Sequence, residues 1–159
     1  MANEKEFALA KSVYENVCKS LDLRNWKYNG NEEDLQIRIN FNGDDIPMNF
    51  IIQVDADRQL ISLLSFLPFD IAKEKRVEAA LATCFINYML ADGSFDLSLG
   101  DGTILYRMTT SYRGSLVSKD VFSNMVDVAC CIVDEYNDKL AALNKGEIEI
   151  ADFIKSIVD

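Results

Sequence analysis

The sequence contains no histidine, and this absence excludes the most familiar catalytic arrangements. Without histidine there is no Ser-His-Asp triad and no Cys-His pair to activate a nucleophile. P-loop and dinucleotide-binding motifs are also missing, and the segment Gly93-Ser94-Phe95-Asp96 lacks the flanking glycine of a nucleophile elbow. The sequence therefore favours a protein that has no catalytic residues and is not an enzyme.

Residue spacings typical of metal sites are missing as well. The chain has four cysteines but no CxxC pair, whereas structural zinc sites need close pairs of cysteine or histidine ligands. The segment that starts at Asp55 begins like a calcium loop, but Leu60 stands where that loop requires glycine. We expect no metal and no cofactor. We also expect the cysteines, which all fall in predicted helices, to stay reduced and to pack as small hydrophobic side chains. They are Cys18, Cys84, Cys130 and Cys131.

Long apolar runs and an excess of positive charge are absent too. The most apolar segment, residues 79–91, is shorter than the roughly 18 residues that cross a bilayer, and the first seven residues do not resemble a signal peptide. The 26 acidic residues outnumber the 16 basic ones, for a net charge of −10. Because phosphate binding needs clustered lysine and arginine, we expect a cytoplasmic protein that binds neither nucleic acid nor membranes.

What the sequence does contain is the pattern of one folded domain spanning residues 1–159. A hydrophobic share of 49% in 159 residues is enough for one sizeable core. Asn3 and Glu6 form a capping-box pattern that starts a helix running to about Leu21. Alternating apolar residues then predict strands over 35–41, 46–54 and 59–67. The segment 23–34 reads as a loop, although Trp26 and Tyr28 could pair as a short strand.

The second half of the chain also predicts both helices and a hairpin. It predicts a helix over 72–91, strands over 94–99 and 103–111, a helix over 119–143 capped by Ser118 and ended by Gly146, and a short helix over 148–158. The order α-β-β-β-α-β-β-α, with strands in hairpins, indicates an antiparallel sheet of about five strands packed with helices. This is an α+β fold.

Two predicted elements carry more apolar surface than one chain readily covers. Strand 59–67 is apolar on both faces, so it is either central and covered twice or it contacts a partner. Helix 72–91 has only Thr83 and Asn87 as polar residues after Ala79, so it needs burial on two sides. The second side is covered by helix 3–21, by the terminal helix, or by a second copy of the chain. The residues expected at a partner or dimer surface are Leu63, Phe85, Ile86 and Met89.

The segment 79–110 also carries a recognisable set of features. They are Asn87 near the end of the helix, Gly93-Ser94-Phe95, Gly100-Asp101-Gly102 and Tyr106-Arg107. This set resembles the YbjN-type family, which is described as bacterial sensory-transduction regulators. The topology resembles the class I type III secretion chaperones, which are acidic cytosolic homodimers that hold an extended segment of a secreted protein. The tail 147–159 lies outside this resemblance.

Two functions remain open from the sequence. The first is a non-catalytic polypeptide-binding module, chaperone-like or regulatory, that acts through an apolar surface or a sheet edge, either alone or as a homodimer. The alternative is a small-ligand sensor or enzyme with a pocket between sheet and helix. Arg107 is expected to pair with Asp96 across its hairpin rather than to bind a ligand.

Overall fold

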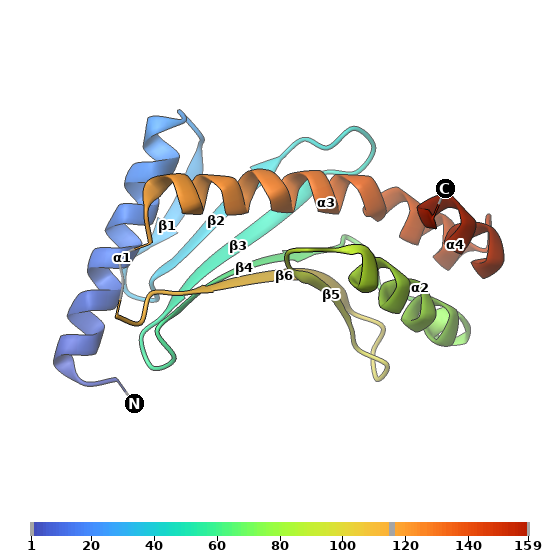
Figure 1. Cartoon of the computed structure of the whole chain (residues 1–159), viewed down its shortest axis with the longest axis horizontal. Helices are drawn as coiled ribbons and strands as arrows, with labels where there is room; N and C mark the ends of the chain where they lie inside the picture. Colours follow the sequence, from blue (N-terminus) through green and yellow to red (C-terminus); the bar gives the residue numbers. More distant parts are fainter. Residues whose placement is uncertain (1, 115–116, 159) are drawn as a thin grey trace.

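The computed structural model describes residues 2–114 and 117–158. Four α-helices are α1 (Glu4–Leu23), α2 (Arg76–Met89), α3 (Lys119–Lys145) and α4 (Ile150–Val158), and a short 3-10 turn, η1 (Lys73–Lys75), leads into α2. The strands are β1 (Tyr28–Asn31), β2 (Gln36–Phe41), β3 (Met48–Asp55), β4 (Leu60–Phe66), β5 (Ser94–Leu97) and β6 (Ile104–Ser111). Figure 1 shows their arrangement.

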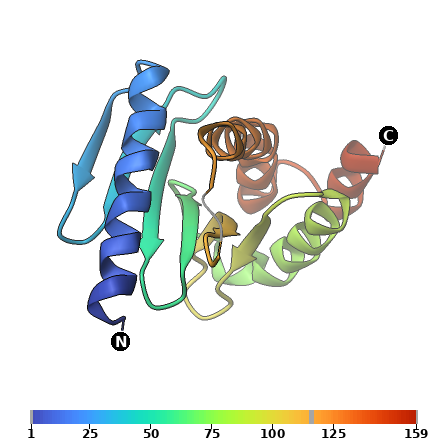
Figure 2. The same ribbon diagram turned by 60° about the vertical axis from the view of Figure 1, so that its left-hand side comes forward.

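The described strands form one antiparallel sheet of six strands in the order β1-β2-β3-β4-β6-β5. Helices α1 and α3 lie across the same face of this sheet and contact each other (Figures 1 and 2). Helix α2 packs against β5 at one end of the sheet and also contacts α3 and α4. The predicted α+β class is therefore confirmed, and β4 lies inside the sheet between β3 and β6.

The sheet has one strand more than the sequence predicted. Residues that read as a loop form β1, in which Gly30 lies opposite Ile37 of β2. The glycine is a packing requirement here rather than a turn signal, because a Cβ atom on Gly30 would lie 2.4 Å from the Tyr14 hydroxyl of α1. Trp26, just before β1, packs edge-on against Phe41 with ring centroids 5.1 Å apart. The chain therefore turns after β1, not within it.

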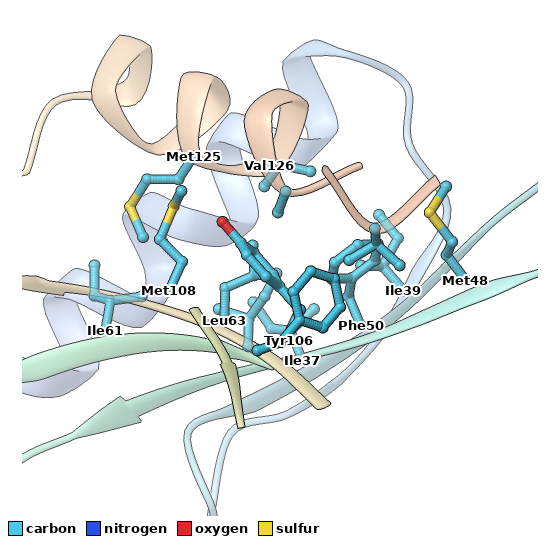
Figure 3. Packing of buried hydrophobic residues seen from close by; sticks show 14 of the residues in the cluster. Ile37, Ile39, Met48, Phe50, Ile61, Leu63, Tyr106, Met108, Met125 and Val126 are labelled. Atoms are coloured by element: carbon cyan, nitrogen blue, oxygen red, sulfur yellow. The ribbon is translucent and has the colours of Figure 1, made fainter. Parts of the chain in front are cut away.

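The hydrophobic core lies between the sheet and helices α1 and α3. Alternate residues of each strand point to this side, as two-residue periodicity requires. Figure 3 shows a part of this layer, in which Tyr106 of β6 and Phe50 of β3 lie below Val126 of α3. Those three side chains are each at most 1% exposed. The core therefore follows the predicted apolar faces of β2 and β3, and on β4 it takes the face with Ile61 and Leu63.

The helix ends agree with the predicted caps. The Asn3 side chain accepts hydrogen bonds from the backbone N–H groups of Lys5 and Glu6, and the Glu6 carboxylate accepts one from the Asn3 backbone N–H, which completes the capping box. Ser118 caps α3, and Gly146 ends it in the left-handed conformation with φ of 73°. Local side-chain chemistry therefore sets these boundaries.

All four cysteines are free, but they are less buried than predicted. Cys84 of α2 and Cys131 of α3 are exposed, whereas Cys18 and Cys130 are half-buried. Burial raises the pKa of the Cys130 thiol to about 12. The expectation that the cysteines pack as buried hydrophobic residues was therefore wrong for Cys84, whereas of the adjacent pair in α3 only Cys130 is partly buried.

Candidate binding surfaces

Helix α2 buries one side and exposes a second apolar side. Its inner side, with Ala79, Ala82, Thr83 and Ile86, packs against the rest of the chain. On its outer side Val77 is 71% exposed, Leu81 49% and Tyr88 85%. Residues three and four apart share one side of a helix, so these side chains form a continuous row. We call this row the α2 stripe; it consists of Val77, Leu81, Cys84, Phe85, Tyr88 and Met89.

The four residues predicted for a partner surface fall into two groups. Phe85 and Met89 are 38% and 51% exposed and belong to the α2 stripe, so in a single chain they lie on the surface, where a partner or a second copy could cover them. Leu63 and Ile86 are fully buried, and the prediction that they lie on a surface was wrong. Leu63 points from β4 toward the helices, and Ile86 lies on the inner side of α2. Helix α4 covers part of α2, but the described chain leaves the stripe in solvent.

A second apolar area lies on the sheet face opposite α1 and α3. On β4 this face carries Leu64 beside Ile51 and Phe66 beside Leu105, and all four are partly exposed. The predicted two-sided strand is therefore covered on one side only within the described residues. The expected ion pair is present on the same face and joins Arg107 Nε to Asp96 Oδ2 at 2.7 Å.

The motif that produced the family resemblance has a structural role. The side chain of Asn87 at the end of α2 accepts a hydrogen bond from the Phe95 N–H at 2.8 Å and donates one to the Phe95 carbonyl at 3.0 Å. Gly93 has a φ of 71°, and a Cβ there would lie 2.2 Å from the Tyr106 hydroxyl. That hydroxyl donates to the Asp92 carbonyl at 2.9 Å. These residues fix α2 to the β5–β6 hairpin.

A cavity of about 460 Å³ lies between β6 and the first turns of α3. Its walls include the apolar side chains of Met108, Val121 and Met125, and two carboxylates, Asp92 and Asp120, stand beside them. A pocket between sheet and helix, which the alternative function requires, is thus present, and its lining residues were not predicted from the sequence. No cluster of cysteine, aspartate and glutamate suited to a metal ion occurs among the described residues.

A family model described as "Putative bacterial sensory transduction regulator" matches residues 14–142. The chain belongs to the YbjN family. Among curated proteins, no relative matches the sequence. The family match ends before the end of α3, so α4 is an addition to the matched region.

Two solved structures share the fold of this YbjN-family chain. One is described as "YbjN, a putative transcription regulator from E. coli"; it has a TM-score of 0.58 at 10% identity, covering 79% of this chain and 92% of that one. The other belongs to the HopA1–SchA chaperone–effector complex; it has a TM-score of 0.52 at 11% identity, covering 86% of this chain and 97% of that one. The resemblance to both YbjN and type III secretion chaperones is thereby confirmed at the level of fold.

Family and fold fit a binding or regulatory module. None of the helices in the described part of this YbjN-family chain is both long and apolar enough to cross a bilayer. Among the described residues, the α2 stripe and the outer face of β4 are exposed apolar areas, and a cavity lies beside β6.

Proposed function

We propose that this chain is a non-catalytic polypeptide-binding module, chaperone-like or regulatory, that acts in the cytoplasm as a homodimer. In this proposal it needs no cofactor and binds neither nucleic acid nor membranes. The observation that carries the proposal is the α2 stripe, in which Tyr88 is 85% and Val77 71% exposed. Contiguous apolar surface of this kind marks a site of protein contact.

A second copy of the chain is the occupant that the α2 stripe fits best. Helix α2 has 14 residues and is therefore roughly 21 Å long, which is enough for two antiparallel copies to pack side by side about a two-fold axis. The exposed Lys73 lies just before α2 and the exposed Asp92 just after it. Antiparallel packing brings each lysine toward the partner's aspartate and opposes the two helix dipoles.

The charge of the stripe supports the same arrangement. The chain carries a net charge of −10, so two copies repel each other wherever their acidic surfaces approach. None of the six residues of the α2 stripe is charged. Contact through this stripe keeps the acidic surfaces apart and leaves them available for a partner with basic segments.

The comparisons support the polypeptide-binding half of the proposal. The family is described as sensory transduction regulators, and a chain from a chaperone–effector complex has the same fold. The second description concerns a complex between two polypeptides, and this supports a polypeptide partner for the present chain. The absence of histidine and of a nucleophile–base pair from the sequence supports a role without catalysis.

Light scattering tests the homodimer directly. The wild-type chain is expected to have the mass of a dimer at micromolar concentrations, and Tyr88→Glu is expected to be a monomer because it places a charge at the most exposed side chain of the stripe. Leu23→Glu is the matched control, since Leu23 is 68% exposed at the end of α1 and lies outside the stripe. A wild-type monomer across the whole concentration range would remove the dimer from the proposal.

Small-ligand sensing is a second candidate, which the cavity beside β6 favours. Its volume of about 460 Å³ lies within the range of small-molecule sites, and apolar walls with few polar groups are typical of them. A metabolite that raises the melting temperature of the wild type, but not of Val121→Trp, would support this candidate. Val121 is 49% exposed at the cavity, so tryptophan fills the space without disturbing the core.

A further inference from the structure

The two strands at one end of the sheet differ in length. Strand β5 pairs only with residues 104–107 of β6, so its register ends where Ser94 lies opposite Arg107. The remaining half of β6, Met108–Ser111, pairs with β4 on one side. Among the described residues no strand pairs with it on the other side. We call this unpaired half of the strand the β6 notch.

The hydrogen-bond pattern shows which backbone groups of the notch face outward. At the two ends of the β4–β6 pair, Tyr112 N donates to Gln59 O and Leu67 N donates to Ile104 O, so even-numbered β6 residues bond to β4. In an antiparallel ladder the residues between them point their N–H and C=O groups the opposite way. Thr109 and Ser111 therefore direct their backbone groups away from β4. Both residues are exposed.

The neighbouring edge of β5 is closed by a side chain. Phe95 is the β5 residue whose N–H and C=O point away from β6, and the Asn87 amide bonds both of them. Gly93 directly precedes β5, and its φ of 71° is not that of an extended strand, so β5 begins at Ser94 and does not extend along the notch. If β5 continued, Asp92 would lie opposite Thr109. The notch is thus an unpaired stretch of sheet edge beside Phe95, whose outward backbone groups are already hydrogen-bonded to Asn87.

The cavity beside β6 opens onto this notch. Its lining includes Met108 and Thr109 of β6 together with Met125 of α3. Figure 3 shows the Met108 and Met125 side chains next to each other between the strand and the helix. Methionine side chains adapt to apolar groups of different shapes. The carboxylates of Asp92 and Asp120 stand at the same cavity.

We propose that the β6 notch binds an extended polypeptide segment by strand addition. The segment pairs with the outward backbone groups of Thr109 and Ser111, and its residue beside Met108 inserts an apolar side chain toward Met125. Four strand residues span roughly 13 Å, so the paired core is about four residues long. A lysine or arginine next to this core meets Asp92 or Asp120.

The parts of this site match the requirements of strand addition. Main-chain hydrogen bonds supply affinity, and a pocket for alternate side chains supplies selectivity. An unpaired strand edge exposes a folded protein to unwanted pairing with other chains. On the adjacent β5 edge the Asn87 side chain bonds the outward groups of Phe95, whereas no such side-chain bonds are present at Thr109 among the described residues. The inference rests on the proposed polypeptide-binding function and specifies where the partner binds.

Amide hydrogen exchange of the free, full-length protein gives the first test. Thr109 and Ser111 are expected to exchange rapidly, whereas Met108 and Thr110, which bond to β4, are expected to be protected. The alternation within one strand is its own control. Protection of Thr109 and Ser111 in the free protein would mean that this chain or a second copy already covers the notch, and the proposal would fail.

The second test uses peptides selected from a displayed random library for binding to the full-length chain. A synthetic selected peptide is expected to protect Thr109 and Ser111 from exchange. Thr109→Pro removes one outward N–H and is expected to weaken binding about tenfold or more. Leu23→Glu, at an exposed position of α1 outside both surfaces, is the control that leaves affinity unchanged. N-methylation at successive peptide positions is expected to abolish binding at alternate residues only.

The outcomes separate this inference from the proposed function. Peptides that bind without protecting Thr109 and Ser111, or that protect Tyr28 and Gly30 at the β1 edge instead, overturn the notch and leave polypeptide binding intact. A library that yields no binder removes both. If N-methylation weakens binding equally at every peptide position, strand pairing is contradicted. This test uses the wild-type protein, so it remains decisive if Thr109→Pro does not fold.

Discussion

Gly102→Ala is expected to lower the free energy of unfolding by about 4 kcal/mol. Gly102 has a φ of 91°, which costs a non-glycine residue about 1–3 kcal/mol. A Cβ at this position would also lie 2.2 Å from the Ile71 carbonyl oxygen, so the backbone would have to shift, at a further cost of about 1–3 kcal/mol. Denaturant titration followed by circular dichroism measures the change.

Gly100→Ala is the matched control for this substitution. Gly100 lies in the same turn, but a Cβ there would be 3.8 Å from its nearest neighbour, the Ser98 hydroxyl oxygen. We expect a change below about 1 kcal/mol, as for most surface substitutions. A Gly102→Ala protein that is as stable as Gly100→Ala would show that the turn does not pack against the segment before α2 as described.

Asn87→Ala is expected to cost about 2–4 kcal/mol. The substitution leaves the N–H and the carbonyl of Phe95 without partners, and each unpaired buried group costs about 1–3 kcal/mol. The neighbouring Tyr88→Ala is the control, since an 85% exposed side chain contributes little within one chain. Thermal and denaturant unfolding of the three proteins, measured below the concentration at which they associate, provides the comparison.

The same substitution has a second expected consequence. Without the Asn87 amide, the outward N–H and carbonyl of Phe95 on the outer edge of β5 are free, and an open edge pairs with other strands. Asn87→Ala is therefore expected to aggregate more readily than wild type at equal fractions folded. Equal stability of Asn87→Ala and Tyr88→Ala would contradict the assigned role of the amide.

The sequence predicted the elements that depend on local chemistry. The capping box at Asn3, the Ser118 cap and the Gly146 end of α3 depend on residues within a few positions of each other. The pairing of Arg107 with Asp96 follows from the alternation of a hairpin. Such features depend on residues close together in the chain, so they can be predicted from a single sequence.

The sequence did not separate the two sides of α2. Phe85 and Ile86 are adjacent and both apolar, and only the packing of α2 on β5 buries Ile86 and leaves Phe85 38% exposed. Gly30 was taken as part of a loop because the reason for a glycine there lies outside its own segment. The hydroxyl of Tyr14 on α1 occupies the space that a Cβ atom would need. The β6 notch was missed for a similar reason, because it arises from the unequal lengths of two paired strands.

The α2 stripe and the β6 notch divide the proposed function between two surfaces. The stripe is apolar, uncharged and suited to a second copy of the chain. The notch offers backbone hydrogen bonds, a methionine-lined cavity and nearby carboxylates, which suit an extended segment with an apolar and a basic residue. Substitutions in one surface are expected to leave the activity of the other unchanged.

The relative labelling of Cys84 and Cys131 tests the central claim most directly. Both thiols are exposed in a single chain, but Cys84 lies in the α2 stripe and Cys131 on α3 outside it. After brief maleimide treatment and peptide mass spectrometry, the ratio of Cys84 to Cys131 labelling is expected to fall as protein concentration rises from nanomolar to tens of micromolar. In Tyr88→Glu the ratio is expected to stay constant. A constant ratio in the wild type over the same range would contradict the account, because the stripe would then be exposed at every concentration.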